Sequence, residues 1–562
     1  MRLRTPALLV TLLLVLLAAP AAAQAAGSPW LAPQTADPES PDVVPKGYKI
    51  SPRQAAAIAE RTDAYRELSA EHSGLQRTVV APLYVRDKRW EVGYQLKGEL
   101  RRTLDLHVDG RTGRVVETWT GPQVNWPLAR GYDPPMGGNL LNKPYVWLPL
   151  CLLFLLPFFD PRRPFRLLHL DLLMLLGFGI SQYFVNQGNL DASVHLVYPF
   201  LLYVMGRLLY AGFRPRERPG RIVPVIPMAA LAIGLVLLVG FRIGLNVADG
   251  AVIDVGFASV IGADRIEHGE PLYTDNDIHG DTYGPITYIS YIPFELVFPF
   301  TGSVTEVPAA RAAAIGFDLL TILGLFLLGS RLRTGREGRR LGLALAFAWT
   351  AFPYSTYVIQ SATNDGLIAM LLVFSMVALT SAPVRGALVG LAAAAKFVPL
   401  ALAPLFAAGT GDRKPLTVAR FAGALLLVVV GSVLVYLPEG GFKEFWNATL
   451  GFQLNRTSPF SVWGLHPGLE PLKTAVTVAT AGLSVALFFV PRHRDARQVA
   501  ALAGVVIIAM QLTAVHWYYF YIVWFLPLAL VAMLGAYRAP EPEEAAEAAP
   551  EAPERELEPV PA

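Results

Sequence analysis

Apolar residues in this chain are gathered into long blocks that short charged segments separate. From residue 145 onward, apolar blocks cover 145–159, 167–187, 193–213, 222–243, 309–329, 341–360, 365–381, 386–409, 417–437, 471–490, 499–515 and 516–536. An α-helix of roughly 20 apolar residues spans the hydrocarbon core of a bilayer. The pattern predicts an all-α polytopic membrane protein with about 12–13 membrane segments.

Residues 50–119 have a different pattern, with polar residues mixed throughout. SPRQAAAIAERTDAYREL has helical spacing, whereas TVVAPLYVRD, RWEVGYQLKG and RTLDLHVDG alternate between apolar and polar positions as strands do. DGRTGRV then forms a turn into a further strand, Val115 to Trp119. The pattern predicts a small α+β domain with no catalytic constellation of its own.

The two ends of the chain read as segments outside these folded parts. Arg2 and Arg4, an apolar core and Ala21–Ala23 form a secretory signal peptide, with an uncleaved first membrane helix as the alternative. The predicted organisation is a signal peptide (1–23), a linker (24–48), the α+β domain (49–121), a connector (122–144), accessory transmembrane helices (145–221), a main transmembrane domain (222–537) and a disordered acidic cytoplasmic tail (538–562).

Composition agrees with a membrane protein. The 562 residues are 53% hydrophobic and 16% charged, and the mean hydropathy is +0.42, which excludes an ordinary soluble enzyme. Cys151 is the one cysteine, so a disulfide framework and a cysteine metal site are excluded.

The arginines predict the orientation, because positively charged segments stay in the cytoplasm. They form clusters after the first, third, fifth and tenth apolar blocks: Arg162, Arg163, Arg166; Arg214, Arg216, Arg218, Arg221; Arg331, Arg333, Arg336, Arg339, Arg340; and Arg492, Arg494, Arg497. We therefore expect a plasma-membrane protein with the α+β domain outside.

Two segments leave the count of crossings open. Gly284–Phe300 is apolar enough to cross, but a crossing would place Arg331–Arg340 outside, so we read it as an interfacial helix held by Tyr288 and Tyr291. Residues 386–409 form either one crossing or two short helices broken near Lys396–Pro399. The second reading is favoured because it keeps Arg413 and Lys414 inside.

A polar loop after the fourth apolar block concentrates carboxylates beside the membrane. It carries Asp249, Asp254, Asp264, Glu267, Glu270, Asp275, Asp277 and Asp281. Carboxylates near hydrocarbon are costly and usually functional. Asp254, close to the outer end of a span, is the candidate general base, and a solvated helix-end carboxylate is the alternative.

Other polar residues carry weaker signals. Asp275-Asn276-Asp277 resembles the Asp-x-Asp motif of nucleotide-sugar enzymes, but a solvated turn is favoured. His268 and His279 do not have the spacing of metal ligands. We expect Asp318 to be buried and hydrogen-bonded, and Asn364 and Asp365 to line a cavity. Asn189 and Asp191 have no assigned role. We expect no metal ion and no cofactor.

Several motifs together resemble known families. They are Asp254-x-x-x-Ala258, Gly269-x-x-Leu272-Tyr273, Tyr283-Gly284-Pro285, Tyr291-x-Pro293-Phe294, Ala395-Lys396-Phe397-x-Pro399, Asn455-Arg456-x-Ser458-Pro459-x-Ser461-x-Trp463-Gly464 and His516-Trp517-Tyr518-Tyr519. In this order the motifs resemble the GT-C superfamily of membrane glycosyltransferases, and among them the mannosyltransferase-like proteins of glycosyltransferase family 87, over residues 222–536. Tyr-Gly-Pro replaces the Tyr-Pro-Pro of many relatives. The N-terminal motifs, Ala55-Ala56-Ile58 and Val108-Asp109-x-x-Thr112-Gly113-Arg114-Val115, are similar to those of PepSY domains.

The resemblance implies a role for each candidate. Asp254 would be the catalytic base, Lys396, Arg456 and Arg265 would bind the donor phosphate with Arg311 as a weaker candidate, and Tyr273, Tyr283, His516 and Trp463 would bind substrate. The implied reaction moves a hexose or pentose, mannose first, from a polyprenyl-phosphate sugar donor to an extracytoplasmic glycan or lipid acceptor with inversion. Expected partners are the donor, the acceptor and membrane lipid, but no nucleic acid. A transporter, or a PepSY-dependent sensor with a degenerate enzyme core, is the alternative.

Overall fold

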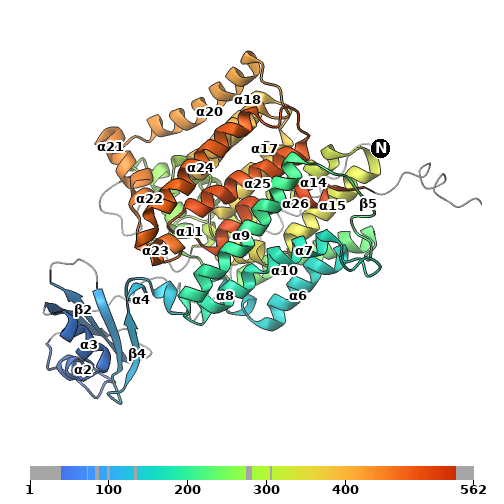
Figure 1. Ribbon diagram of the computed structural model, residues 1–562. Coiled ribbons are helices and arrows are strands. Elements are labelled where there is room, and N and C mark those ends of the chain that lie inside the picture. Colours follow the sequence, from blue (N-terminus) through green and yellow to red (C-terminus); the bar gives the residue numbers. More distant parts are fainter. Residues whose placement is uncertain are drawn as a thin grey trace, which may run out of the picture.

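The computed structural model describes residues 40–72, 74–82, 88–97, 102–131, 136–273, 282–303 and 307–538. Figure 1 shows a helical bundle with a small α+β domain attached at one end of it. The predicted signal peptide, most of the predicted linker, the tail beyond Arg538, and Asp275, Asp277, His279 and Asp281 lie outside the described residues. Both fold-class predictions, the all-α membrane part and the α+β domain, are confirmed.

The N-terminal domain packs helices α2 (Pro52–Ala59) and α3 (Asp63–Glu71) on an antiparallel sheet. Its strands are β1 (Leu75–Pro82), β2 (Arg89–Leu96), β3 (Arg102–Asp109) and β4 (Val115–Thr120), in the order β1-β2-β3-β4. Trp90 and Val92 on β2 and Leu104 and Leu106 on β3 are buried at every second position, because successive side chains of a strand point to opposite faces.

A short connector ties this domain to the bundle. It contains α4 (Pro122–Asn125), the 3₁₀ turn η1 (Pro127–Arg130) and α5 (Gly138–Leu141). Arg130 donates through Nη2 to Asp105 Oδ2 on β3 at 2.7 Å and through Nε to the Gln123 carbonyl at 2.7 Å. Since Asp105 is fully buried, this ion pair fixes the connector against the sheet.

The bundle contains a helix at every predicted apolar block. Its helices are α6 (Pro144–Leu155), η2 (Leu156–Phe158), α7 (Leu167–Leu176), α8 (Phe178–Asn186), α9 (Leu190–Phe213), α10 (Met228–Asp249), α11 (Asp254–His268), α12 (Pro285–Ile289), α13 (Ile292–Glu295), α14 (Pro308–Leu332), α15 (Gly335–Ala351), α16 (Pro353–Gln360), α17 (Asp365–Val377), α18 (Ala382–Ala395), η3 (Val398–Leu402), α19 (Ala403–Ala408), α20 (Pro415–Val435), α21 (Gly441–Trp446), the π-helical η4 (Asn447–Gly451), α22 (Phe452–Asn455), α23 (Val462–Leu465), η5 (Pro467–Leu469), α24 (Glu470–Phe489), α25 (Ala496–Thr513), η6 (Tyr519–Tyr521) and α26 (Ile522–Leu534). Within the described residues, 7 helical segments are long and apolar enough to cross a membrane. This finding supports a multi-pass membrane protein.

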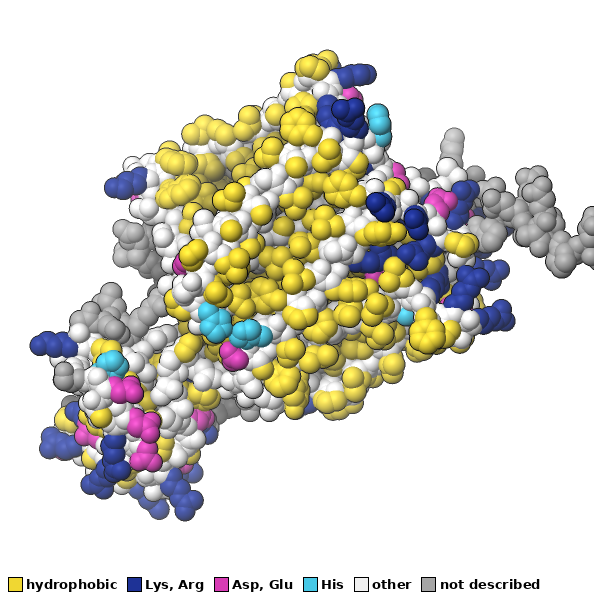
Figure 2. Space-filling model, viewed as in Figure 1, with side chains coloured by type: hydrophobic (Ala, Val, Ile, Leu, Met, Phe, Trp, Pro, Cys, Tyr) yellow, Lys and Arg dark blue, Asp and Glu magenta, His cyan; other side chains and the backbone are white. Residues whose placement is uncertain are grey.

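The predicted arginine clusters meet at one end of the bundle. Arg166 Nη2 donates to the Arg221 carbonyl at 3.0 Å, and Arg497 Nη1 donates to the Arg216 carbonyl at 3.3 Å. Nearby, β5 (Arg218–Pro219) pairs with β6 (Tyr537–Arg538). Figure 2 shows most Lys and Arg side chains of the bundle gathered away from the N-terminal domain, with apolar side chains covering the surface between.

The break near Lys396 is confirmed as a hairpin. Arg385, near the start of α18, donates to the carbonyls of Phe406 at 2.7 Å and Ala407 at 3.2 Å at the end of α19. The two ends of this segment therefore lie together. Arg413, just beyond, donates to the carbonyl of Phe488 at 2.6 Å beside the last arginine cluster.

Two expectations about the acidic segment are corrected. Residues 254–268 form a helix, because Phe257, Val260 and Ala263 make an apolar face and Gly269, with φ of 69°, supplies the left-handed C-terminal cap. Gly284–Phe300 forms only the short α12 and α13 in the described residues, and Tyr288 and Tyr291 are fully buried in protein instead of anchoring at an interface.

Candidate functional site

A buried ion pair lies at the centre of the site. Lys396 follows α18 and Asp365 opens α17, and Lys396 Nζ lies 2.6 Å from Asp365 Oδ1. The indole Nε1 of Trp524 donates to the same oxygen at 3.0 Å. Asp365 is 1% exposed and Lys396 is 8% exposed, so each charge depends on the other for its stabilisation.

Aromatic rings surround the ammonium group. Lys396 Nζ lies 5.2 Å from the ring centre of Tyr283, 5.2 Å from that of Trp524 and 5.9 Å from that of Tyr521. Cation–π attraction to these rings adds to the ion pair with Asp365 and holds the ammonium in this position.

The Tyr283–Gly284 turn is fixed against the end of α18. The Gly284 N–H and the Thr287 hydroxyl both donate to the Ala395 carbonyl, at 3.1 and 2.9 Å. A Cβ at Gly284 would collide with the Ala394 carbonyl oxygen. Glycine at this position, the departure from Tyr-Pro-Pro, therefore allows the turn to approach the α18 backbone and places Tyr283 beside Lys396.

Asp254 is the first residue of α11, and its carboxylate is exposed. Its Oδ1 accepts a hydrogen bond from the Val255 N–H at 2.8 Å. The helix N-terminus favours the ionised form of a carboxylate at this position. Burial first, and then the Asp254 charge, raise the pKa of the Tyr283 hydroxyl well above its usual value, so Tyr283 remains a neutral donor.

Charged groups from three distant segments lie near two tyrosines of the site. Tyr283 and Tyr521 both lie within electrostatic range of the same three side chains, Asp254, Asp365 and Arg456. His516 lies within electrostatic range of Arg456 and Lys396. Asp254, Lys396 and Arg456 therefore all lie near Tyr283, and of the three Arg456 alone lines the two cavities described below.

Arg456 follows α22 and faces the connector. Its guanidinium lies 5.5 Å from the Trp126 ring, and Trp126 also contacts Phe460 and His516, each at 5.8 Å between ring centres. His516 Nδ1 is hydrogen-bonded to Ser458 Oγ at 2.8 Å. A residue from the connector therefore forms part of the wall beside Arg456.

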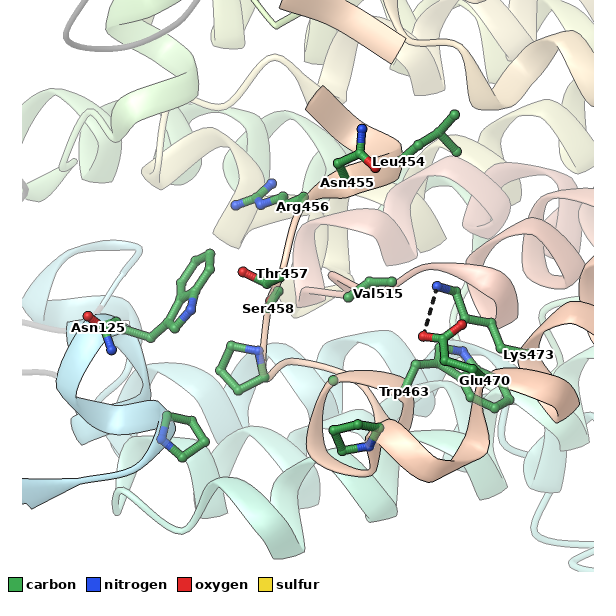
Figure 3. Close-up of a pocket in the computed structure, with 15 residues that line it drawn as sticks. Asn125, Leu454, Asn455, Arg456, Thr457, Ser458, Trp463, Glu470, Lys473 and Val515 are labelled. Carbon is green, nitrogen blue, oxygen red and sulfur yellow. Dashed lines mark ion pairs between the residues drawn. The ribbon is translucent and has the colours of Figure 1, made fainter. Parts of the chain in front are cut away.

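Two open cavities meet along Arg456 and Trp126. One has a volume of about 570 Å³ and is lined among others by Asn125, Thr457 and Trp463. Figure 3 shows Arg456 extending toward the side of this groove on which Asn125 lies. The other, of about 560 Å³, is bounded by Asn447, Gly451 and Phe452.

Other predicted residues lie at the edges of the cluster or outside it. Tyr273 is buried, and its hydroxyl donates to the Tyr283 carbonyl at 2.9 Å, so it supports the turn from behind. Trp463 donates from Nε1 to the Leu512 carbonyl at 2.9 Å. Arg265 lies on the last turn of α11, about 16 Å along the helix from Asp254. Arg311 donates to the Gly250 carbonyl at 2.6 Å, beyond the end of α10.

The sequence prediction missed three aromatic residues of this cluster, Trp126, Tyr521 and Trp524. The sequence predicts Asn364 and Asp365 at a cavity but does not predict the pairing of Asp365 with Lys396. A signal was present, because a lysine in an apolar block requires a partner. Asp318 is confirmed as a buried, hydrogen-bonded group, 2.9 Å from Arg242 Nη2 and 2.7 Å from Trp349 Nε1.

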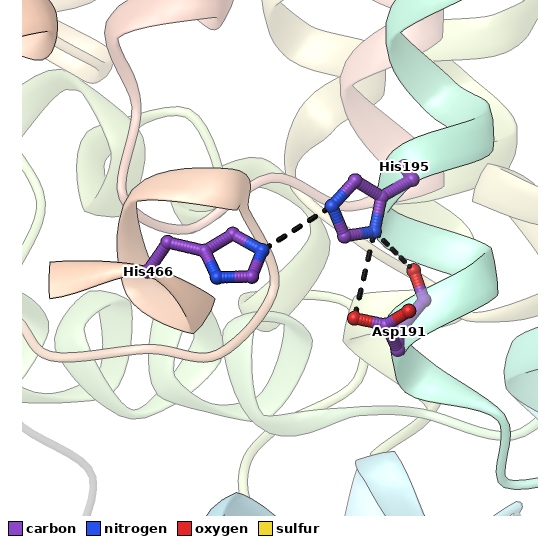
Figure 4. Close-up of side chains that lie close together, drawn as sticks. All are labelled: Asp191, His195 and His466. Atoms are coloured by element: carbon purple, nitrogen blue, oxygen red, sulfur yellow. Dashed lines mark hydrogen bonds and ion pairs between the residues drawn. The ribbon is translucent and has the colours of Figure 1, made fainter. Parts of the chain in front are cut away.

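Two groups of side chains in the described residues have the composition of a metal site. Glu91, Asp105 and His107 form the first, but Arg102, Arg130 and Glu117 already bind them within 2.7 Å. Asp191, His195 and His466 form the second, at the surface of the bundle (Figure 4). The second group lies apart from the Lys396 cluster.

Residues 282–549 match the family model of glycosyltransferase family 87. No curated protein matches the chain. The matched region contains Tyr283, Lys396, Arg456 and His516, while Asp254 and Trp126 lie before it. The match supports a membrane glycosyltransferase, of which residues 282–549 are the part similar to family 87.

Proposed function

We propose that this protein transfers a sugar, mannose first among hexoses and pentoses, from a polyprenyl-phosphate donor to an extracytoplasmic glycan or lipid acceptor. The observation that carries the proposal is the meeting of one exposed carboxylate, Asp254, with two cations, Lys396 and Arg456, around Tyr283. Such a transfer requires a base for the acceptor hydroxyl and positive charge for the leaving phosphate.

The chemistry assigns one task to each group. Asp254 accepts the proton of the acceptor hydroxyl as its oxygen attacks the anomeric carbon. The bond from that carbon to the phosphate oxygen breaks, and the configuration inverts. Arg456 and Lys396 stabilise the released polyprenyl phosphate, Arg456 through a planar guanidinium suited to two phosphate oxygens.

The two cavities suit the two substrates. The cavity beside Phe452 lies next to large apolar side chains that are open to the surroundings: Phe452 is 45% exposed, and Trp446, which packs on the cavity-lining Gly451, is 40% exposed. This side favours the polyprenyl chain. The groove beside Asn125, Thr457 and Trp463 combines hydrogen-bonding groups with an aromatic ring, which favours a saccharide acceptor. Arg456 lines both cavities and would hold the phosphate between them.

The orientation follows from the arginine clusters. With these clusters in the cytoplasm, the site and the N-terminal domain face the outside of the plasma membrane. Nucleotide sugars are absent there, so a lipid-linked donor is required. We further propose that the PepSY-like domain (49–121) is a binding or regulatory module, joined to the transferase domain (222–537) through the connector and the accessory helices.

The test is a transfer assay with purified full-length protein and radiolabelled polyprenyl-phosphate mannose. Wild type should release polyprenyl phosphate and label an acceptor fraction from the cell envelope. Asp254→Asn should reduce turnover at least 100-fold while donor binding is retained. Asp264→Asn, on the same helix, is the matched control and should retain activity.

Two results would contradict the proposal. Turnover of Asp254→Asn equal to that of wild type excludes Asp254 as the base. Absence of release by wild type with mannose, glucose, galactose and arabinose donors excludes the polyprenyl-phosphate reaction for these sugars.

A further inference from the structure

Two histidines from distant parts of the chain face each other at the bundle surface. His195 is on the second turn of α9, and His466 joins α23 to η5. Their Nε2 atoms lie 3.3 Å apart although 271 residues separate them. Asp191, one turn before His195, brings a carboxylate oxygen to 3.6 Å from His195 Nδ1 (Figure 4).

We infer that His195, His466 and Asp191 form a binding site for a divalent transition-metal ion of the zinc type. One ligand atom from each residue lies within 4.8 Å of the other two. Two nitrogens bound tetrahedrally to zinc at about 2.0–2.1 Å lie about 3.3 Å from each other. The observed Nε2–Nε2 distance of 3.3 Å equals that spacing.

The protonation state of His195 also suits a ligand. Its Nδ1 is 2.8 Å from the Asp191 backbone carbonyl, so Nδ1 carries the proton and Nε2 presents its lone pair toward His466. A histidine whose second nitrogen donates to a carbonyl is the usual arrangement in metal sites. All three side chains are exposed, so an ion can enter and water can complete its coordination.

The Asp191 carboxylate lies on the Nδ1 side of His195 in Figure 4. To join an ion held between the two Nε2 atoms, its side chain must rotate. We therefore assign the two imidazoles as the primary ligands and Asp191 as a third ligand that strengthens binding.

A hydrogen bond beside the histidines already joins helices α9 and α23. The Val462 N–H donates to the Tyr198 hydroxyl at 3.1 Å, which joins α23 to α9. α23 belongs to the segment that carries Arg456 and Trp463. A bound ion would therefore fasten this segment to the accessory helices and stabilise the wall of the groove.

The experiment is a titration of EDTA-stripped full-length protein in detergent with ZnCl₂, followed by calorimetry and thermal unfolding. We expect one Zn²⁺ per chain with a dissociation constant in the micromolar range or below, and a higher Tm. His195→Ala and His466→Ala should each weaken binding at least tenfold, and Asp191→Asn about threefold.

The matched control is His268→Ala. His268 pairs with Asp264 at 3.3 Å with the same spacing of four residues on a helix, but no second histidine joins it among the described residues. This variant should bind Zn²⁺ as wild type does. Loading with Co²⁺ should give the visible absorption of a tetrahedral nitrogen-oxygen site in wild type and lose it in His466→Ala.

Three results would overturn the assignment: no binding by wild type at 100-fold molar excess of Zn²⁺, equal binding by His466→Ala, or loss of binding in His268→Ala. The titration requires neither donor nor acceptor. Its outcome is therefore independent of the proposed transferase reaction.

Discussion

At the scale of single residues, the pair of Lys396 and Asp365 has the largest consequences. Both charges are removed from solvent. Lys396 Nζ donates to Asp365 Oδ1, and the indole of Trp524 donates to the same oxygen. A buried charge that loses its partner is strongly destabilising, whereas removal of both charges often is not. The pair also connects stability to function, because the same ammonium is proposed to bind phosphate.

Lys396→Met should lower the free energy of unfolding by about 3–5 kcal/mol, because Asp365 is left as an unpaired buried charge. The double variant Lys396→Met/Asp365→Asn should recover most of that loss. Thermal unfolding in micelles measures both, and a transfer assay should find both inactive. A double variant as unstable as the single one would show that the ion pair is not the cause.

Trp126→Ala should raise the KM for both the acceptor and the donor, by about tenfold each, since Trp126 lines both cavities and the wall beside Arg456 is lost. Trp126→Phe keeps an aromatic face and should recover most of the affinity. Steady-state kinetics with each substrate varied in turn provides the measurement. Unchanged KM values for both substrates would show that Trp126 does not form part of the substrate site.

At the scale of elements, β3 and β4 of the N-terminal domain depend on a charged pair. His107 Nδ1 lies 2.7 Å from Glu117 Oε2 across the two strands. The hydrogen bond with His107 is the main cause that lowers the pKa of Glu117 to about 2. Burial lowers the pKa of His107, but Asp105 and Glu117 outweigh it and raise the pKa overall.

The sign of the pH dependence follows from these shifts. Glu117 has a depressed pKa in the folded state, so its contribution is present above pH 4.5 and is lost as the pH falls toward 2. His107 has a raised pKa, so its contribution is present below pH 6.5 and is lost as the pH rises through the folded pKa. Protection of the β3 and β4 amides should therefore be greatest between about pH 5 and 6.

Hydrogen exchange of the full chain, corrected for the intrinsic pH dependence of exchange, tests this expectation. In Glu117→Gln, protection of the β3 and β4 amides should no longer fall as the pH is lowered below about 4.5. An unchanged acid limb in this variant would assign the pH dependence to other carboxylates.

At the scale of the whole molecule, orientation is the open prediction. In a Cys151→Ala background, a cysteine at Glu71 should react with an impermeant maleimide in intact cells. A cysteine at Arg216 should react only after permeabilisation. Both positions are exposed, so access and not burial decides the result. The reverse pattern would place the site on the cytoplasmic side and exclude a donor used outside the cell.

The sequence by itself determined the features that depend on local pattern. Hydrophobic periodicity and block length are local properties, so the sequence predicts the helices at the apolar blocks and the α+β domain correctly. Arginine spacing predicted which ends of the helices lie together, and motif order indicated Asp254, Lys396 and Arg456. The roles of these three residues remain predictions.

The tertiary structure decided which residues meet. The partner of Lys396 is 31 residues away in sequence, the partner of His195 is 271 residues away, and Trp126 reaches Arg456 from a connector with no motif. Long-range contacts result from how helices pack, and one sequence carries no local signal for them. Helix α11 escaped prediction for a related reason. Its uncharged stretch, residues 255–263, is short and contains Gly256 and Gly262, which are poor helix formers, while burial against the bundle stabilises the helix.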